Sequence, residues 1–235
     1  MTAEELSPHL HAVSIVLASS RTVLELSRNQ RALGIDGPVV AENGAVIALP
    51  WRESDSLPGT HEIIDDREWR VLRLGASAAS IRDVIRSNAA SLRTPFIDQS
   101  DIHPTLGREC SVLLRPDDSA SLDVLAGALS SQGYTVASGG SWLAVTRNAD
   151  KGVGARALLD VLRAEGQGTS RVAAVGDGDN DAPLLSTAED RFVIRRTDGS
   201  WHPELLALPG VRRVLVVGID GWRDVIETIT SSPAR

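Results

Sequence analysis

The sequence predicts an α/β protein with a Rossmann-like parallel sheet core and an inserted α+β cap domain. Short apolar strands alternate with helices in the first and last parts of the chain, which is the pattern of a parallel sheet covered by helices on both faces. Between about Gly75 and Asn148 this alternation gives way to a helix, strand, helix and two strands, which is typical of a small α+β module. We therefore expect a core domain at 1–74 and 149–235 and the inserted domain at 75–148.

Three strands are expected in the first part of the core, at 12–18, from Val39 and at 45–49. The first is a short apolar and β-branched run, which predicts a buried strand. A helix follows it to about Leu33, with a serine as N-cap and Gly34 beyond its C-terminus. Asn43-Gly44 between two apolar runs predicts a hairpin. The polar stretch 51–66 contains Pro58-Gly59 and predicts a loop.

The remaining elements follow the same rules of periodicity and turn residues. In the inserted domain we expect helices at 78–90 and 118–131 and strands near 109–114, 134–137 and 142–146. In the second part of the core we expect a helix at 152–165, strands at 172–175, 192–194 and 214–217, and a last helix from Trp222.

Composition excludes several classes of protein. The chain has 235 residues and 42% hydrophobic residues, enough for a sizeable core. A formal net charge of −7 is the wrong sign for binding nucleic acid through its phosphates. No apolar run approaches a membrane span, and the N-terminus lacks the order of a signal peptide, so we expect a cytoplasmic protein with no membrane partner. The single cysteine, Cys110, cannot form an internal disulfide.

An acidic loop follows the apolar strand at 172–175. Its sequence Gly176-Asp177-Gly178-Asp179-Asn180-Asp181 places three carboxylates within five residues, and these repel one another unless a cation holds them. Mg²⁺ with part of its water shell suits oxygen ligands of this kind. An EF-hand calcium loop is excluded because Ala182 and Ala188 stand where it needs glycine and glutamate. A solvated acidic turn remains the alternative.

Two further groups suit an anion. Ser19 and Ser20 end a strand and open a helix, where hydroxyl and free amide groups favour negative charge, although a simple serine N-cap explains them equally well. Lys151 is the only lysine of the chain beside 23 arginines, which favours a position that needs a compact point charge. The alternative is that this single lysine has no special role and stands by chance in a composition dominated by arginine. Hydroxyl, ammonium and metal-binding carboxylate groups at three loops of one sheet are the groups that proteins use to bind and transfer a phosphoryl group.

These motifs resemble the haloacid-dehalogenase-like phosphatases with a C2-type cap. The order of IVLASSRT, AENGAVI, GRECS, SGGSWL, DKG, GDGDND and GIDGW is similar to the mannosyl-3-phosphoglycerate phosphatase branch of that superfamily, from Val13 to about Ile226. The resemblance implies a Mg²⁺-dependent phosphatase of a small phosphorylated sugar or glycosyl-3-phosphoglycerate, with the inserted domain as a lid. Its oligomeric state is not indicated.

The resemblance also assigns roles to residues. Ser19 and Lys151 would bind the phosphoryl oxygens, and Asp177 and Asp181 would hold the metal. Substrate-binding candidates are Ser20, Asn43, Arg108, Gly140, Ser141 and Asn180. Arg108 suits a glycerate carboxylate because its guanidinium can bind a carboxylate with two hydrogen bonds. An ordinary surface arginine is the alternative.

One motif of the family is missing. In the family, an early strand ends in Asp-x-Asp, whose first aspartate attacks phosphorus, and it lies between the strands that end at Ser19 and Asp177. Residues 1–11 hold no aspartate and no strand pattern. We therefore expect the chain as written to be inactive, either as a phosphosugar-binding paralogue or as an N-terminally truncated chain with a misassigned start. A dinucleotide-binding domain is disfavoured because no G-x-G-x-x-G follows an early strand.

Overall fold

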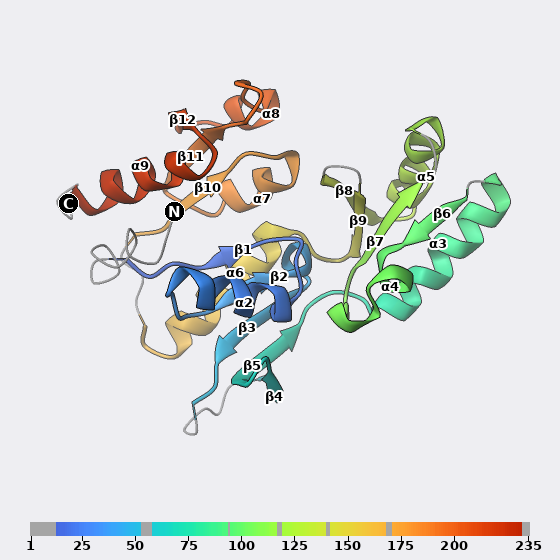
Figure 1. Ribbon diagram of the computed structural model, residues 1–235, viewed down its shortest axis with the longest axis horizontal. Helices are drawn as coiled ribbons and strands as arrows, with labels where there is room; N and C mark the ends of the chain where they lie inside the picture. Colours follow the sequence, from blue (N-terminus) through green and yellow to red (C-terminus); the bar gives the residue numbers. More distant parts are fainter. Residues whose placement is uncertain are drawn as a thin grey trace.

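The computed structural model describes residues 13–52, 58–93, 95–116, 119–139, 142–167 and 171–231. Its strands form three sheets, with the orders β1-β2-β3-β5-β4, β10-β11-β12 and β6-β7-β9-β8. Figure 1 shows the last of these set apart on one side of the molecule, and the other two sheets together on the opposite side. The predicted α/β fold class is confirmed.

The five-stranded sheet consists of β1 (Leu17–Ala18), β2 (Val39–Ala41), β3 (Val46–Pro50), β4 (Thr60–Ile64) and β5 (Arg67–Arg73). Only β1 and β2 pair in parallel, and the other neighbours are antiparallel. The predicted hairpin is confirmed, with the 3-10 turn η2 (Glu42–Gly44) between β2 and β3. The first strand is shorter than predicted, because its ladder with β2 covers only two positions.

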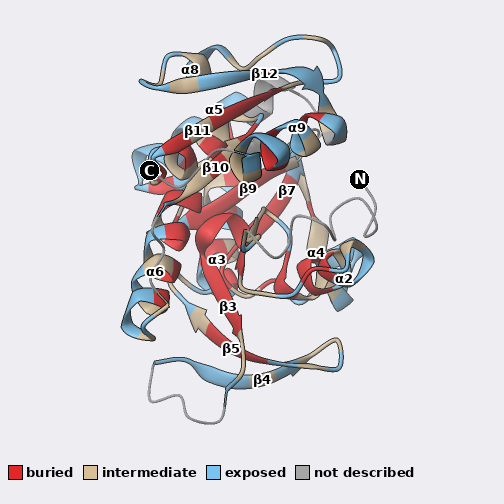
Figure 2. Cartoon of the chain, turned by 90° about the vertical axis from the view of Figure 1, so that its left-hand side faces the viewer, coloured by how far each residue is buried: buried red, intermediate tan, exposed pale blue. Residues whose placement is uncertain are grey.

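The predicted loop over 51–66 was wrong, because β4 lies within it and pairs with β5. This strand is at the edge of the sheet, and most of its residues are exposed or half-buried, as Figure 2 shows in pale blue. An edge strand whose side chains are largely exposed carries polar and charged residues, which also discourage pairing with another chain. Its sequence, Thr60-His61-Glu62-Ile63-Ile64, therefore lacks the apolar character that marks a buried strand.

The three-stranded sheet is parallel throughout and consists of β10 (Ala173–Gly176), β11 (Asp190–Arg195) and β12 (Val211–Val217). Its helices are α7 (Ala182–Leu185), α8 (Pro203–Leu206) and α9 (Gly218–Ser231), and the 3-10 turn η4 (Asp179–Asp181) precedes α7. The last helix begins four residues before Trp222, where the sequence predicts its start. Gly221 allows this, since a Cβ there would lie 2.7 Å from the Val216 carbonyl oxygen.

Helices α2 (Val23–Leu33) and α6 (Lys151–Ala164) flank the five-stranded sheet. The prediction of a serine N-cap for α2 was wrong. Thr22 caps the helix in a reciprocal pair with Glu25, which satisfies two amides that one serine would leave to solvent. Gly34 ends the helix in the left-handed conformation, as predicted.

The four-stranded sheet consists of β6 (Phe96–Asp98), β7 (Val112–Pro116), β8 (Tyr134–Gly139) and β9 (Trp142–Arg147). It is antiparallel and is accompanied by α3 (Ala78–Leu92), α4 (Gln99–Ile102), α5 (Ser119–Ser131) and the 3-10 turn η3 (Pro104–Leu106). Ile81 and Ile85 of α3, Leu125 of α5 and Val145 of β9 share one core cluster. These elements fall within 75–148, and the division into domains stays a prediction.

No ladder joins β1 to β10 among the described residues, although both are edges of sheets with parallel pairing. One helix belongs to clusters with both strands: Ile226 of α9 shares a cluster with Leu17, and Val225 of the same helix shares another with Val175. Leu17 and Val175 are only half-buried, whereas all of β2 is buried. Among the described residues, β1 and β10 are therefore sheet edges that share a helix but no hydrogen-bonded strand.

Candidate active site

Three loops after strand ends and the start of α6 come together in the core. Ser19 follows β1, the η2 turn follows β2, and the loop with Asp177 and Asp181 follows β10. Asn180 Nδ2 donates to Asn43 Oδ1 at 3.2 Å, so side chains 137 positions apart in sequence meet. Ligands of open α/β sheets bind at the carboxyl ends of the strands, which is where these groups lie.

The loop at Ser19 is tied to β2 and to the η2 turn by backbone hydrogen bonds. Ser19 N donates to the Val40 carbonyl oxygen at 2.9 Å, and Asn43 N donates to the Ser19 carbonyl oxygen at 2.9 Å. The Ser19 hydroxyl accepts from Arg21 N at 3.3 Å. Since Thr22 caps α2, the half-buried Ser19 hydroxyl is not needed as its N-cap.

Small residues allow α6 to approach the η2 turn closely. A Cβ on Gly44 would lie 1.9 Å from the Asp150 carbonyl oxygen, and one on Gly154 would lie 2.6 Å from Gly44 Cα. On its other side, a Cβ on Gly152 would lie 2.5 Å from the Pro183 carbonyl oxygen. The first turn of α6 is therefore packed between η2 and α7, and this fixes the position of Lys151.

Lys151 forms a buried ion pair with Asp181. Its Nζ donates to Asp181 Oδ1 at 2.6 Å, and the two side chains are 8% and 7% exposed. The other oxygen, Oδ2, accepts from the amides of Asp177 and Gly178 at 3.0 and 3.1 Å. A Cβ on Gly176 would lie 2.4 Å from Asp181 Cβ, so this glycine lets the carboxylate fold back over the strand end.

The predicted metal ligands, Asp177 and Asp181, are neighbours in this loop. Asp177 is exposed, and Arg196 Nε donates to its carbonyl oxygen at 3.1 Å. The described residues contain no group of three or more His, Cys, Asp or Glu that could hold a metal ion. Mg²⁺ needs fewer protein ligands, since it keeps several waters and takes one or two carboxylates together with substrate phosphate. The two aspartates fit such an open site, in which Mg²⁺ would compete with Lys151 for Asp181.

A cavity of about 140 Å³ lies between these loops and β8. Asn43, Lys151 and Asn180 line it, as do Thr135 and Ala137 of β8. Sequence reasoning missed the β8 residues, since nothing in the strand pattern shows which part of the core it faces. The volume is below the roughly 300–1,000 Å³ of ordinary ligand pockets, so a sugar would need the four-stranded sheet to move away.

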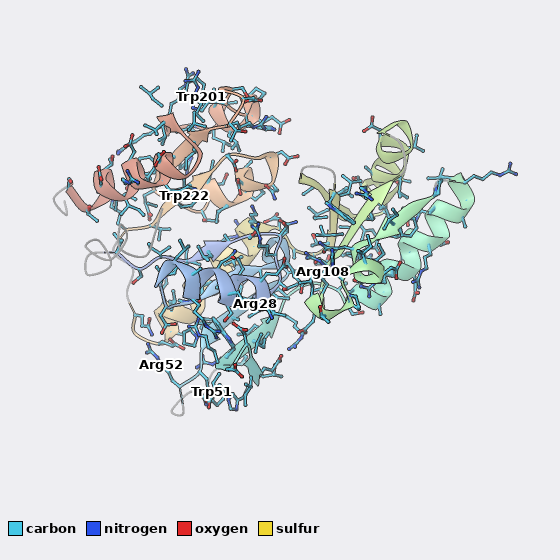
Figure 3. The ribbon with its side chains drawn as sticks, in the orientation of Figure 1. Arg28, Trp51, Arg52, Arg108, Trp201 and Trp222 are labelled. Atoms are coloured by element: carbon cyan, nitrogen blue, oxygen red, sulfur yellow. The ribbon has the colours of Figure 1, made fainter. Side chains whose placement is uncertain are left out.

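Arg108 is buried at the junction of the two parts of the molecule, as Figure 3 shows. Its Nη1 donates to the Ser20 carbonyl oxygen at 2.7 Å and its Nε donates to Gln99 Oε1 at 2.8 Å. Burial lowers the pKa of the Arg108 guanidinium, against the raising effect of Glu42 and Glu25. Because these donors already have protein partners, binding of a substrate carboxylate by Arg108 stays a prediction.

Three predicted substrate-binding residues remain. Ser20 presents its carbonyl oxygen to Arg108, whereas Gly140 and Ser141 fall outside the described residues. A wider and more open hollow of about 510 Å³ lies beside α3 and α4, lined in part by Arg82, Arg86 and Arg108. None of the loop residues after β1, β2 and β10 lines it. The smaller cavity is therefore the one lined by predicted residues of these loops, Asn43 and Asn180, together with Lys151.

Comparisons with known proteins bear on this arrangement. No protein-family model matches the chain. The chain is 25% identical over 233 residues to a glucosyl-3-phosphoglycerate/mannosyl-3-phosphoglycerate phosphatase of Methanococcoides burtonii, covering 91% of this chain and 84% of that protein. It is 28% identical over 196 residues to the mannosyl-3-phosphoglycerate phosphatase of Pyrococcus furiosus, covering 77% of each.

The fold also matches a solved structure, that of a haloacid dehalogenase-like hydrolase from B. subtilis. The TM-score is 0.66 at 12% identity, covering 97% of this chain and 92% of that one. The predicted resemblance to the haloacid-dehalogenase-like phosphatases is thus confirmed, and the chain has their fold. Within the described residues, no helix combines the length and apolar character needed to cross a bilayer.

Proposed function

We propose that this protein is a Mg²⁺-dependent phosphatase that acts on a small phosphorylated sugar or a glycosyl-3-phosphoglycerate. The observation that carries the proposal is a chain of contacts beside one small cavity. Asn43 binds the Ser19 carbonyl through its amide and accepts from Asn180, and Lys151 pairs with Asp181. Asn43, Lys151 and Asn180 line the cavity. The substrate class is supported by the relatives, two of which are phosphatases named for glycosyl-3-phosphoglycerates.

Each residue group has a role in this proposal. The Lys151 ammonium and the Ser19 hydroxyl bind phosphoryl oxygens, because charge-assisted hydrogen bonds are the strong ones at an anion. Asp177 and Asp181 hold Mg²⁺, which when bound supplies positive charge where the phosphoryl group develops negative charge. The remaining part of the substrate faces Asn43 and Asn180, together with Ser20, Arg108, Gly140 and Ser141. The four-stranded sheet covers the site and excludes water.

A second candidate function is binding of a phosphosugar without cleavage. It is considered because no described strand pairs with both β1 and β10. In the family that the sequence resembles, the attacking aspartate belongs to a strand at this place. A protein that binds the phosphosugar without cleaving it would use the same anion and metal groups.

Calorimetry and phosphate release distinguish the two functions. We expect the chain to bind Mg²⁺ and inorganic phosphate, and the Asp177→Ala variant to lose Mg²⁺ binding. Asp36→Ala is the matched control, since Asp36 pairs with Arg67 away from the site. Release of phosphate from mannosyl-3-phosphoglycerate that Asp177→Ala abolishes would identify a phosphatase, while binding without release would identify a binding protein. Equal Mg²⁺ affinity of parent and Asp177→Ala would refute the metal assignment.

A further inference from the structure

Glu42 is a buried acid in the η2 turn, 2% exposed, and its carboxylate reaches across to the other part of the molecule. Oε1 accepts from Glu109 N at 3.0 Å. Oε2 accepts from Cys110 N at 2.9 Å and from Ser111 Oγ at 2.7 Å. These three donors stand immediately before β7, a strand of the four-stranded sheet. The Glu42 carboxylate thus ties the segment before β7 to the η2 turn of the core.

The backbone of the turn is held in a conformation that non-glycine residues disfavour. Glu42, Asn43 and Gly44 have φ values of 50°, 53° and 87°. Left-handed backbone brings Cβ close to a carbonyl oxygen, so it persists only where surrounding contacts hold it. The Glu42 carboxylate supplies three such contacts, and Glu42 N adds a fourth by donating to the Arg21 carbonyl oxygen at 2.8 Å.

The same turn supplies Asn43 to the candidate active site. The side chain of Asn43 lines the cavity and accepts from Asn180 at 3.2 Å, while its backbone amide holds the Ser19 carbonyl. Neither Glu42 nor Ser111 lines the cavity. Arg108 strengthens the connection, since its Nη1 donates to both the Ser20 carbonyl oxygen and Ser111 Oγ, at 2.7 and 3.2 Å.

We propose that Glu42 is a positioning residue, which couples the placement of the four-stranded sheet to the orientation of Asn43 and Ser19 in the phosphate site. The expected effect on substrate binding rests on the proposed function, whereas the coupling between the four-stranded sheet and the η2 turn does not. Movement of the segment at Glu109–Ser111 withdraws the donors that keep Glu42 in place. The η2 turn then relaxes, and Asn43 loses its contact with Asn180.

Two variants test the coupling from opposite ends. Glu42→Gln replaces one acceptor oxygen by an amide NH₂, which faces amide donors and cannot accept from them. We expect hydrogen exchange at the amides of Glu109 and Cys110 to become at least tenfold faster. Ser111→Ala removes one donor on the sheet side and leaves the η2 turn chemically intact. In both variants we expect the side-chain amide NMR signals of Asn43 and Asn180 to shift.

Glu165→Gln is the matched control, because Glu165 also pairs with a buried cation, Arg70, at 2.8 Å but lies at the other end of α6. It should leave the Asn43 and Asn180 signals in place. Unchanged signals in Ser111→Ala, or unchanged exchange in Glu42→Gln, would overturn the coupling. Titration with inorganic phosphate separates the two proposals. If the parent chain binds no phosphate, the proposed function fails, and the hydrogen-exchange and NMR measurements still decide the coupling. If the parent chain binds phosphate, its affinity should fall about five- to tenfold in Glu42→Gln.

Discussion

Replacing Lys151 by methionine leaves the carboxylate of Asp181 buried without its cation. The two side chains are 8% and 7% exposed and their charged atoms are 2.6 Å apart, so solvent screens the pair little. Removing one partner of such a pair costs about 3–5 kcal/mol. Asp181 Oδ2 keeps its two amide donors, and we therefore expect the lower end, a loss of about 3 kcal/mol in the free energy of unfolding. For a chain of this size that lowers Tm by roughly 6–12 °C.

A double-mutant cycle with Asp181→Asn, followed by urea denaturation, measures the pair itself. The double variant buries no uncompensated charge, so it should lose less stability than the two single variants together, by about 1–3 kcal/mol. If the losses simply add within about 0.5 kcal/mol, the two side chains do not interact and the reasoning is refuted. Lys151→Arg should not restore stability, because its planar fork is longer and the helix start is tightly packed by Gly152 and Gly154.

The same variants show whether Lys151 also serves a ligand. If its ammonium binds a phosphoryl group, Lys151→Met weakens the affinity for inorganic phosphate by about 1.5–3 kcal/mol, the scale of a charge-assisted hydrogen bond. This corresponds to roughly a 10- to 150-fold rise in Kd by calorimetry. An unchanged Kd in both the methionine and arginine variants would leave Lys151 with a structural role only.

Two further predictions concern the sheet and the cysteine. Joining a designed apolar strand that ends in Asp-x-Asp to the N-terminus should raise the urea midpoint and increase Mg²⁺-dependent phosphate release, because it offers β1 and β10 a strand partner that they do not share among the described residues; an unchanged midpoint would contradict it. Burial raises the pKa of the Cys110 thiol to about 11 from the ordinary 9.0, so iodoacetamide at pH 8 should not modify the folded protein. The thiol of the unfolded state loses its proton at a lower pH than that of the folded state. The stability contributed by Cys110 is therefore full below about pH 9 and is lost as the pH rises towards 11. Urea denaturation at several pH values measures this loss.

Sequence patterns predict best where local chemistry decides the structure. The acidic loop and Lys151 each follow a strand and open a helical turn, as predicted. The expectation that the three loops belong to one sheet was wrong, because β1, β9 and β10 lie in three different sheets, and sequence patterns do not show which strands pair. The helix α3 was predicted within two residues of its observed ends, because its apolar positions recur with helical spacing. The edge strand β4 was missed because a strand with one neighbour does not need an apolar sequence.

Contacts between distant segments were beyond prediction for a different reason. Nothing local to Glu42 shows that its carboxylate meets the amides of Glu109 and Cys110, which are 67 and 68 positions away. An Asn-Gly turn explains the sequence there without any role for the preceding acid. Likewise, the pattern of β8 gives an alternation of faces, but only the packed molecule shows that Thr135 and Ala137 line the cavity.

The candidate site is held together mainly through α6. No ladder joins β1 to β10 among the described strands, so the loops that carry Ser19 and Asp181 are not aligned by a common sheet. Leu158 of α6 packs in one cluster with Val40 and Ile47 of the five-stranded sheet. At its first turn, the same helix contacts α7 through Gly152 and pairs Lys151 with Asp181. A change that loosens α6 should therefore separate the anion-binding and metal-binding groups, even where each loop keeps its own conformation.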